Sequence, residues 1–443
     1  MKLYLNQDVV IKDFNNKGIL INVERARYQK VNGTGLFIAS QIKQKNGLTE
    51  EEIFTLVSEH YQIPVRLIEE DVKTFIKGLM DVQFVGYDSE MTYEEEADEG
   101  NDGNGIWIQV TNGCNLRCKY CYADAGCSEN DLTLEEIDTI LSQLKEQDFS
   151  KIVVTGGEPL LRKDILDILK ICSKYGRVQL LTNGIVDDSQ LYEKILELVD
   201  MVQISLDSYE QGIHDANRGK GSFDKSVKTI QTIAGIAPNK LTIAMTPTPE
   251  YMADLVEMIK FCMEHQIQVL HINRFVPYGR AHSYEKSLDM REFFKWVDTG
   301  YDFLYKKYEE AMKEKKEFIF NLDVASDSRT IVYTTTRKCS CGLNENIISV
   351  GYDGSVYLCP SLHVEESKLG NIRQKPITEI IKEAKEKYGC FDVEHLSECK
   401  KCIVRHYCGG GCRALALRYS NDLYGKEENC DAYEERVYDL MLR

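Results

Sequence analysis

Three cysteines on one short loop constrain this chain more than any other feature. Cys114, Cys118 and Cys121 follow one another with C-x3-C-x2-C spacing, directly after the apolar run 106–110. The pattern predicts a strand that ends in a loop of metal ligands. Three thiolates can hold three corners of a 4Fe–4S cube and leave the fourth iron open, whereas structural zinc and electron-transfer clusters normally take four protein ligands. A zinc or redox site completed by a distant fourth cysteine is the alternative.

Tyr120, immediately before the last of these cysteines, completes a pattern that resembles the radical S-adenosylmethionine superfamily. The resemblance implies that the open iron binds S-adenosylmethionine through the amino and carboxylate groups of the cofactor. It also implies that Cys114, Cys118 and Cys121 are the ligands of the catalytic cluster and that Tyr120 belongs to the cofactor site.

The composition is that of an ordinary folded protein with an acidic balance. The chain has 443 residues, 43% hydrophobic and 28% charged, which is enough for two or three domains. No apolar run reaches membrane-spanning length and the N-terminus lacks the apolar core of a signal peptide, so we expect a cytoplasmic protein without a membrane partner. A formal net charge of −17 argues against nucleic acid as a partner. Fifteen cysteines in a reducing compartment favour metal ligation over disulfides.

Residues 1–86 show the pattern of a small separate domain, with strands expected before helices. The strands are expected at 9–14, 18–22 and 28–31, and the helices at 35–44, 49–61 and 67–79. This order is winged-helix-like, and Thr49 with Glu52 predicts a capping box on the second helix. The domain resembles the leader-recognition element of peptide-modifying enzymes, which implies that a precursor's leader adds a strand to its sheet. A docking or dimerisation domain is the alternative, and the acidic balance disfavours a DNA-binding winged helix.

An acidic linker at 87–104 is expected to let this domain move relative to the catalytic one at 105–313. In the catalytic domain, strands and helices alternate six times, with strands expected at 106–110, 152–155, 178–182, 202–206, 241–245 and 269–274. Alternation of this kind implies an α/β fold with a parallel sheet, whose chemistry lies at the carboxyl ends of the strands. Six units rather than eight fit the partial (β/α)6 TIM barrel of the resembled family.

The second strand is followed by Gly156, Gly157 and Glu158. Adjacent glycines let the backbone approach a ligand closely, and a carboxylate beside them can accept from an ammonium group. A simple turn is the alternative for a Gly-Gly pair alone. The resemblance implies that this segment contacts the amino group of S-adenosylmethionine.

Three polar residues further along the chain complete the predicted cofactor site. The resemblance implies that Asn183 and Ser205 line the ribose and carboxylate region, and turn or capping roles are the alternative for both. It also implies that Arg218 pairs with the methionine carboxylate, a bidentate role for which lysine is less suited.

A second group of cysteines begins at residue 339, within the predicted bridging region and C-terminal domain, 314–443. Its spacing matches the SPASM extension of the same superfamily, which implies two auxiliary clusters and three 4Fe–4S clusters in all. The resemblance assigns three ligands of the first auxiliary cluster to Cys341, Cys359 and Cys412. It assigns the second auxiliary cluster to Cys399, Cys402, Cys408 and Cys430. Glycines 409–411 allow tight wrapping, and a zinc ribbon is the alternative for 399–412.

The fourth ligand of the first auxiliary cluster is the point at which this sequence departs from the family pattern. Cys339 is the nearby candidate, although it lies only two residues before Cys341. The alternative is an open iron that could bind a substrate thiolate. Four cysteines have no ligand role in this scheme: Cys127, Cys172, Cys262 and Cys390. Cys172 and Cys262 lie in apolar helical patterns and are expected in the core, whereas Cys390 has no interpretation.

The three regions together resemble peptide maturases that form thioether bridges, the sactipeptide and ranthipeptide types. The resemblance implies that a cluster reduced by a flavodoxin- or ferredoxin-type protein cleaves S-adenosylmethionine to a 5′-deoxyadenosyl radical. This radical abstracts hydrogen from a ribosomal precursor peptide, the carbon radical joins a cysteine sulfur, and the surplus electron leaves through the auxiliary clusters. The alternatives are carbon–carbon crosslinking, oxidative decarboxylation, formylglycine formation, or a peptide-binding iron–sulfur scaffold without turnover.

Overall fold

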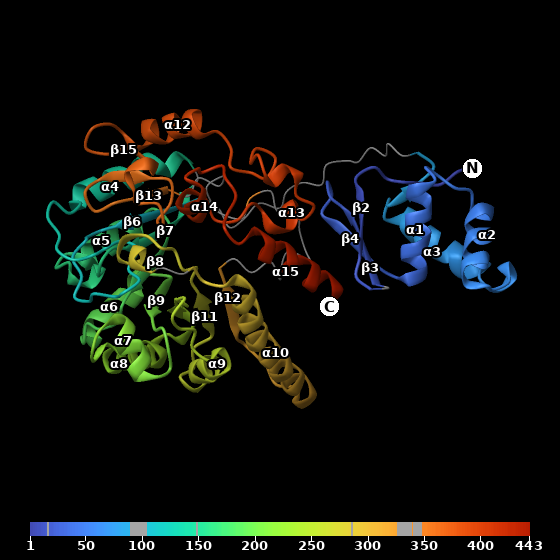
Figure 1. The fold of residues 1–443 in the computed structure, drawn as a ribbon. Coiled ribbons are helices and arrows are strands. Elements are labelled where there is room, and N and C mark those ends of the chain that lie inside the picture. The colour runs from blue at the N-terminus through green and yellow to red at the C-terminus, as the bar shows by residue number, and fades with distance from the viewer. Residues whose placement is uncertain (16, 89–103, 148, 285–286, 326–338, 340–347) are drawn as a thin grey trace.

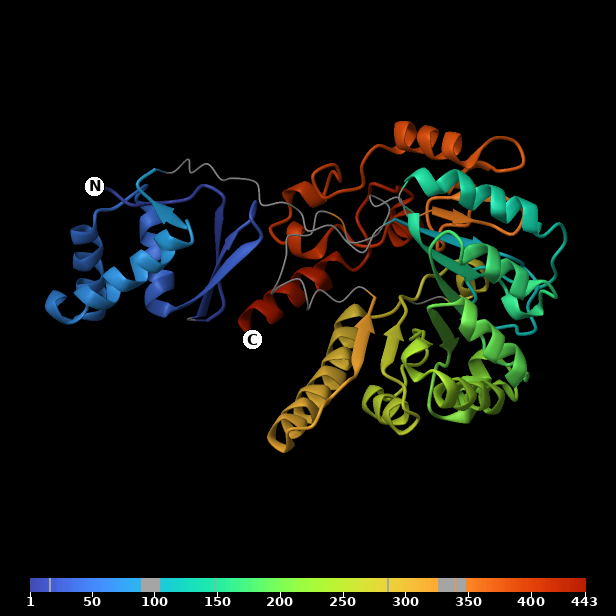
Figure 2. The ribbon, with the colours of Figure 1, turned by 180° about the vertical axis from the view of Figure 1, so that it is seen from behind.

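The computed structural model describes residues 1–15, 17–88, 104–147, 149–284, 287–325, 339 and 348–443. These residues form a small N-terminal domain and a larger body that holds the sheet and the cysteine-rich region (Figure 1, Figure 2). Most of the predicted acidic linker, residues 89–103, lies outside the described part. Within the described ranges, no helix is both long enough and apolar enough to cross a membrane.

The N-terminal domain has the order predicted for it, strands followed by helices. Its antiparallel sheet has the order β2 (Val9–Asp13), β3 (Lys17–Asn22) and β4 (Arg27–Asn32). The helices are α1 (Gly33–Gln44), α2 (Glu50–Tyr61) and α3 (Glu69–Asp81). Thr49 caps α2 in the predicted box with Glu52. A pair the sequence did not indicate, β1 (Tyr4–Leu5) with β5 (Val85–Gly86), joins the two ends of the domain.

The six predicted strands of the catalytic domain are present, and a seventh extends their sheet. They are β6 (Asn104–Gln109), β7 (Phe149–Thr155), β8 (Arg177–Thr182), β9 (Met201–Ser205), β10 (Leu241–Met245), β11 (Val269–Ile272) and the added β12 (Asn321–Val324). These strands lie side by side in chain order, and each neighbouring pair is parallel. The sheet has two edges in the described residues, at β12 and β15, so it is a partial barrel, as expected.

Helices connect these strands and bury the apolar residues of the sheet. They are α4 (Leu134–Leu144), α5 (Ile165–Cys172), α6 (Ser189–Leu198), α7 (Gln211–Arg218), α8 (Ser222–Ile236), α9 (Leu255–Glu264) and α10 (Met290–Glu314). Cys172 and Cys262 are fully buried in this core, as predicted. Burying each leucine, isoleucine or valine side chain of this core contributes about 1.5–3 kcal/mol, and the continuous core fixes the strand ends that carry the site.

The cysteine-rich region continues the same sheet beyond residue 313. β13 (Ile348–Val350) pairs parallel to β6, and β14 (Ser355–Tyr357) and β15 (Lys368–Asn371) follow as antiparallel neighbours. Residues 351–354 form the turn between β13 and β14. The helices that follow are α12 (Ile377–Tyr388), α13 (Arg405–Cys408), α14 (Arg413–Ser420) and α15 (Cys430–Leu442). The cysteine-rich region is thereby attached to the barrel edge nearest the first strand.

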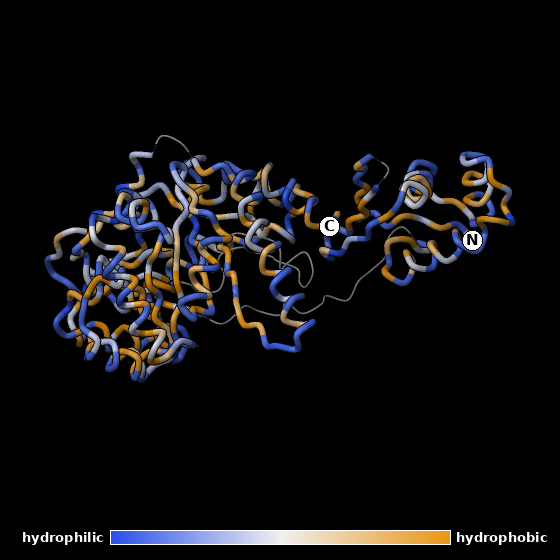
Figure 3. Tube along the Cα trace, turned by 90° about the horizontal axis from the view of Figure 1, so that it is seen from below, coloured by the Kyte–Doolittle hydropathy of each residue, from blue (hydrophilic) through white to orange (hydrophobic). Residues whose placement is uncertain are grey.

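The N-terminal domain packs against the C-terminal end of the chain. Ile19 and Ile21 of β3 share a buried cluster with α13 and α15, which contribute Tyr407, Val437 and Met441. The ribbon views place the strands of this domain beside α15, and hydropathy colouring marks apolar segments in both parts (Figure 1, Figure 3). The sequence led us to expect a domain that can move relative to the catalytic one, and in the structure this domain makes an apolar contact with α13 and α15.

Candidate active site and cysteine clusters

The loop that carries Cys114, Cys118 and Cys121 leaves the carboxyl end of β6 and is held by hydrogen bonds. The Cys114 N–H donates to the Gly126 carbonyl at 3.0 Å. Arg280 donates from Nε to the Cys118 carbonyl at 2.9 Å and from Nη1 to the Ala125 carbonyl at 2.8 Å. One guanidinium, from the segment after β11, therefore fixes two points of the ligand loop. The sequence did not assign Arg280 a role.

The three loop thiols share one partly buried environment. Burial raises the pKa of the Cys118 thiol to about 11, and the charges of Cys121 and Cys114 contribute to the rise. Arg218 opposes it. Since thiolates are the metal ligands, binding iron here must displace protons that the free thiols hold tightly. The loop therefore brings the three thiols near enough for their charges to influence one another.

The turn after β7 lies directly on the cysteine loop. The Gly157 N–H donates to the Thr111 carbonyl and the Glu158 N–H donates to the Gly113 carbonyl, each at 2.8 Å. A Cβ atom on Gly157 would lie 2.3 Å from the Gly113 oxygen, so only glycine permits this approach. Gly156 approaches Thr111 in the same way. The glycines that the sequence assigned to cofactor contact also hold two strand ends together.

The Glu158 carboxylate, which the sequence offered as an ammonium acceptor, accepts three hydrogen bonds from the protein itself. It is fully buried and accepts from the Thr182 hydroxyl at 2.8 Å, the Asn183 N–H at 2.8 Å and the Leu160 N–H at 3.0 Å. Burial raises its pKa, and these bonds oppose the rise. The carboxylate therefore ties the turn after β7 to the end of β8.

Arg218 lies at the end of α7 and makes a buried ion pair with Asp207. Its Nε and Nη2 donate to the two carboxylate oxygens at 2.8 and 2.9 Å. The Tyr120 hydroxyl donates to the same carboxylate, and the guanidinium lies 5.5 Å from the centre of the Tyr120 ring. Asp207 thus joins two residues that the sequence placed in the cofactor site. The only signal for it was its position just after β9.

Asn183 directly follows β8 and Ser205 is the last residue of β9, so both lie at the carboxyl ends of neighbouring strands. Asn183 donates from Nδ2 to the side-chain oxygen of Asn115, a neighbour of Cys114, at 2.8 Å. Ser205 is half-buried at the last position of its strand. The structure therefore brings Asn183 to the cysteine loop and keeps Ser205 at the predicted strand end.

Cys359 and Cys412 meet on one side of the cysteine-rich region. Both pack on a buried cluster that includes Leu358, Phe391 and Leu415. Burial raises the pKa of Tyr278 to about 12, and charges on both Cys412 and Cys359 contribute. Cys339 donates from its thiol to the Phe391 carbonyl at 3.6 Å, which places it at the same cluster. Cys341, the remaining predicted ligand, lies outside the described residues.

The other four predicted auxiliary ligands line a single cavity of about 250 Å³: Cys399, Cys402, Cys408 and Cys430. Three successive glycines, Gly409 to Gly411, adopt left-handed backbone angles after Cys408. A side chain at such φ values is strained, so the tight return of the chain toward Cys412 needs this run. Four thiols around one cavity match the ligand number of a fully coordinated cluster.

Glu427 lies between these two groups of cysteines. Its carboxylate accepts from the Cys412 N–H at 2.6 Å and from Arg274 Nη1 at 3.1 Å. In the second group of cysteines, burial raises the pKa of the Cys408 and Cys430 thiols to about 12, and the negative charge of Glu427 contributes to the rise. Arg274 follows β11, so a buried ion pair connects the barrel mouth to both groups. Nothing in the sequence pattern had indicated Glu427.

Comparison with protein families divides the chain into the same three regions. Residues 17–85 match coenzyme PQQ synthesis protein D (PqqD), 108–262 match the radical SAM superfamily, and 339–403 match the iron–sulfur cluster-binding SPASM domain. The match to PqqD falls on the N-terminal domain, and the match to SPASM begins at Cys339. The three predicted regions therefore each have a counterpart.

Two relatives are about one quarter identical to this chain over the aligned residues, and one solved structure shares its fold. An AdoMet-dependent heme synthase of Nitratidesulfovibrio vulgaris is 26% identical, over 74% of this chain and 92% of its own length. The mycofactocin maturase MftC of Mycolicibacterium smegmatis is 24% identical, over 73% of this chain and 81% of its own. Streptococcus suis SuiB, solved with its precursor peptide SuiA, has the same fold, with a TM-score of 0.59 and 14% identity over 97% of this chain and 99% of SuiB.

Proposed function

We propose that this chain forms thioether bridges in a ribosomal precursor peptide. It belongs to the radical S-adenosylmethionine peptide maturases that carry PqqD-like and SPASM domains. The proposed reaction joins a cysteine sulfur of the peptide to one of its carbons. The carbon loses a hydrogen atom to the 5′-deoxyadenosyl radical, which leaves as 5′-deoxyadenosine, the thiol loses a proton, and one surplus electron passes to the protein's acceptors.

The residues present suit the cofactors that this chemistry needs. Cys114, Cys118 and Cys121 would hold the catalytic cluster, and Asn183 with the backbone of Gly156 and Gly157 would bind S-adenosylmethionine. When bound and reduced, the cluster supplies the electron that cleaves S-adenosylmethionine. The chain contributes position: Arg280 fixes the ligand loop, and Asp207 fixes Arg218 and Tyr120.

The observation that carries the proposal is that Tyr122, on the barrel loop, is influenced by cysteines of both regions. Burial raises the pKa of the Tyr122 phenol, and the charges of Cys121 and Cys359 raise it further, so both thiols lie within electrostatic range of this phenol. Bond formation between carbon and sulfur releases an electron, and an acceptor near the radical can take it. We propose two auxiliary 4Fe–4S clusters for this task, three clusters in all, with a flavodoxin- or ferredoxin-type protein as the initial reductant.

For the first auxiliary cluster we propose Cys339 as the fourth ligand, beside Cys341, Cys359 and Cys412. A fully ligated cluster has no iron to bind the substrate thiol and acts in electron transfer. Loss of the Cys339 thiol would open an iron and change the cluster's potential. The check is the auxiliary EPR spectrum with and without added thiol, in wild type and in Cys339→Ala. A response to thiol in the wild type would show that the site is already open.

A peptide substrate is supported by the likeness in fold to a structure that holds a precursor peptide. The likeness to SuiB bound to SuiA covers 97% of this chain, including the N-terminal domain. The PqqD-like match over 17–85 lies in the domain that we expect to bind a leader.

The test is mass spectrometry of a cysteine-containing peptide encoded beside the gene, after anaerobic reaction with reconstituted enzyme, reductant and S-adenosylmethionine. A thioether removes two hydrogen atoms per bridge and makes one cysteine resistant to alkylation. A carbon–carbon crosslink would remove the same mass but leave every thiol reactive, oxidative decarboxylation would remove carbon dioxide, and formylglycine would convert the cysteine into an aldehyde. A peptide unchanged while 5′-deoxyadenosine accumulates would contradict peptide modification.

A further inference from the structure

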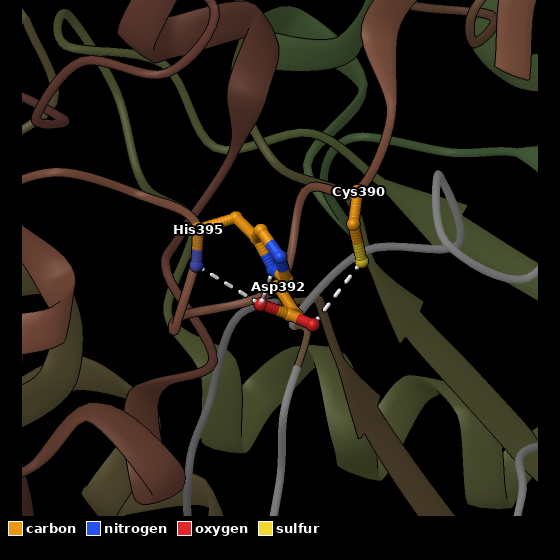
Figure 4. Close-up of side chains that lie close together, drawn as sticks. All are labelled: Cys390, Asp392 and His395. Carbon is orange, nitrogen blue, oxygen red and sulfur yellow. Dashed lines mark hydrogen bonds and ion pairs between the residues drawn. The ribbon is translucent and has the colours of Figure 1, made fainter. Parts of the chain in front are cut away.

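One group of metal-ligating side chains lies apart from the predicted cluster ligands. Cys390, Asp392 and His395 follow α12 in the chain and come together within six residues (Figure 4). A ligand atom of each, sulfur, carboxylate oxygen and imidazole nitrogen, lies within 4.8 Å of the other two. From this arrangement we propose that Cys390, Asp392 and His395 form a binding site for one Zn²⁺ ion, distinct from the iron–sulfur clusters.

The local backbone points these three side chains to one side of the segment. Phe391 and Val393 lie between them in sequence and Leu396 follows them, and these three apolar residues are buried, at 3%, 0% and 0% exposure. Phe391 also stacks on Tyr424, with ring centres 4.9 Å apart. Because these apolar side chains point into the core, the side chains of Cys390, Asp392 and His395 lie together on the other side of the segment.

Asp392 already connects the other two residues. One carboxylate oxygen accepts from the backbone N–H of His395 at 3.1 Å and lies 2.7 Å from its Nδ1. The other oxygen accepts from the Cys390 thiol at 3.1 Å. The first oxygen can keep its turn-forming bond to the backbone while the second binds a metal. A cation held between the Cys390 sulfur and this second oxygen would take the place of the thiol proton.

The donor set selects zinc among divalent ions. A thiolate, a carboxylate and a neutral imidazole carry two negative charges together, and zinc accepts all three ligand types. Ligands of tetrahedral zinc lie about 2.0–2.3 Å from the ion, so they lie about 3.3–3.7 Å from one another. His395 has a side chain 61% exposed and can rotate to close this distance, and water can take the fourth position. The Asp392 side chain is only 16% exposed.

The site would stabilise the segment that supports the auxiliary clusters. A Cβ atom on Gly410 would lie 2.7 Å from Leu396 Cδ1 and 3.6 Å from Val393 Cγ1, so this segment packs on the glycine run between Cys408 and Cys412. Zinc that ties Cys390 to His395 would fix the segment against that run. The ion has no redox chemistry of its own, so it would not compete with electron transfer.

The test uses reconstituted holoenzyme given one equivalent of Zn²⁺ anaerobically and then desalted. We expect about one zinc per chain, and zinc K-edge absorption should show one sulfur at about 2.3 Å with nitrogen or oxygen at about 2.0–2.2 Å. His395→Ala and Cys390→Ser should each lose nearly all of the zinc while iron per chain stays at the wild-type value. Cys127→Ser, which replaces an exposed cysteine elsewhere, is the matched control and should retain zinc.

Three results would overturn the site. The wild-type enzyme could retain no zinc after desalting, or His395→Ala could retain as much as wild type. Loss of iron in Cys390→Ser would instead make that cysteine a cluster ligand. Since His395 is exposed, its replacement by alanine leaves the core intact, and a negative result with this variant counts against the proposal directly.

Discussion

Arg218 and Asp207 face each other as a bidentate ion pair, with Nε to Oδ2 at 2.8 Å and Nη2 to Oδ1 at 2.9 Å. The arginine side chain is 8% exposed and the aspartate side chain 1%. The pair therefore sets where the guanidinium lies before any cofactor binds. An arginine assigned to the methionine carboxylate by resemblance is already held by a carboxylate of the protein.

We expect Asp207→Asn to destabilise the barrel by about 3–5 kcal/mol, because it leaves the Arg218 charge buried without a counter-ion. The measurement is the free energy of unfolding in urea. Tyr120→Phe is the matched control, since it removes one hydrogen bond to Asp207 and should reduce stability by about 1 kcal/mol. Equal stabilities of the two variants would show that the ion pair is not what holds this region.

Cys118→Ala should abolish formation of 5′-deoxyadenosine and leave the auxiliary iron in place, because each cluster has its own ligands. Iron per chain should fall by one cluster, and the remaining iron should show the auxiliary EPR signals. Cleavage of S-adenosylmethionine at the wild-type rate in this variant would remove the loop from the active site.

Periodicity and cysteine spacing predicted most of the fold. All six strands of the catalytic domain and the three helices of the N-terminal domain lie where the pattern placed them. β12 was missed because its parallel pairing with β11 is a contact between segments that are distant in the sequence. The attachment of β13 to β6 is also a contact between distant segments, and spacing does not encode it.

The sequence motifs named residues of the candidate site but did not predict which neighbours their side chains contact. Glu158 lies where the motif placed it, yet its carboxylate faces Thr182 and Asn183 inside the sheet. Arg280 and Glu427 act on the cysteine segments from distant parts of the chain. Contacts of this kind depend on how strands and loops meet, so one sequence without its fold does not contain a local signal for them.

His214 should make stability depend on pH below neutrality. Burial lowers the pKa of this imidazole to about 4, and its Nδ1 accepts from the Asp207 N–H at 3.2 Å, so the folded protein keeps it neutral. The unfolded chain binds a proton near the ordinary pKa of about 6.5. Its contribution to stability is therefore present above that value and decreases as pH falls toward 4.

Between pH 7 and pH 5 we expect the free energy of unfolding to fall by about 2 kcal/mol more in the wild type than in His214→Asn. Asparagine can offer Oδ1 in place of Nδ1 but does not titrate. The comparison is made by urea unfolding of both proteins at each pH. Parallel pH profiles would mean that His214 is not the group responsible.

A precursor without its leader should bind the enzyme about 10-fold or more weakly than the full precursor, because the N-terminal domain would lose its ligand. Removing the leader is cleaner than deleting residues 1–86, since that deletion would expose Val437 and Met441. Binding is measured by fluorescence anisotropy, with the isolated leader as competitor. Equal affinity for both peptides would leave the N-terminal domain without a recognition role.

The most direct test of peptide modification follows the abstracted hydrogen. A precursor peptide produced in fully deuterated medium is returned to ordinary water, which exchanges only hydrogens bound to nitrogen, oxygen and sulfur. It is then reacted with reconstituted enzyme, reductant and unlabelled S-adenosylmethionine, and the 5′-deoxyadenosine is weighed by mass spectrometry. We predict one deuterium in 5′-deoxyadenosine, taken from a carbon of the peptide. 5′-Deoxyadenosine that forms without deuterium would contradict hydrogen abstraction from the peptide.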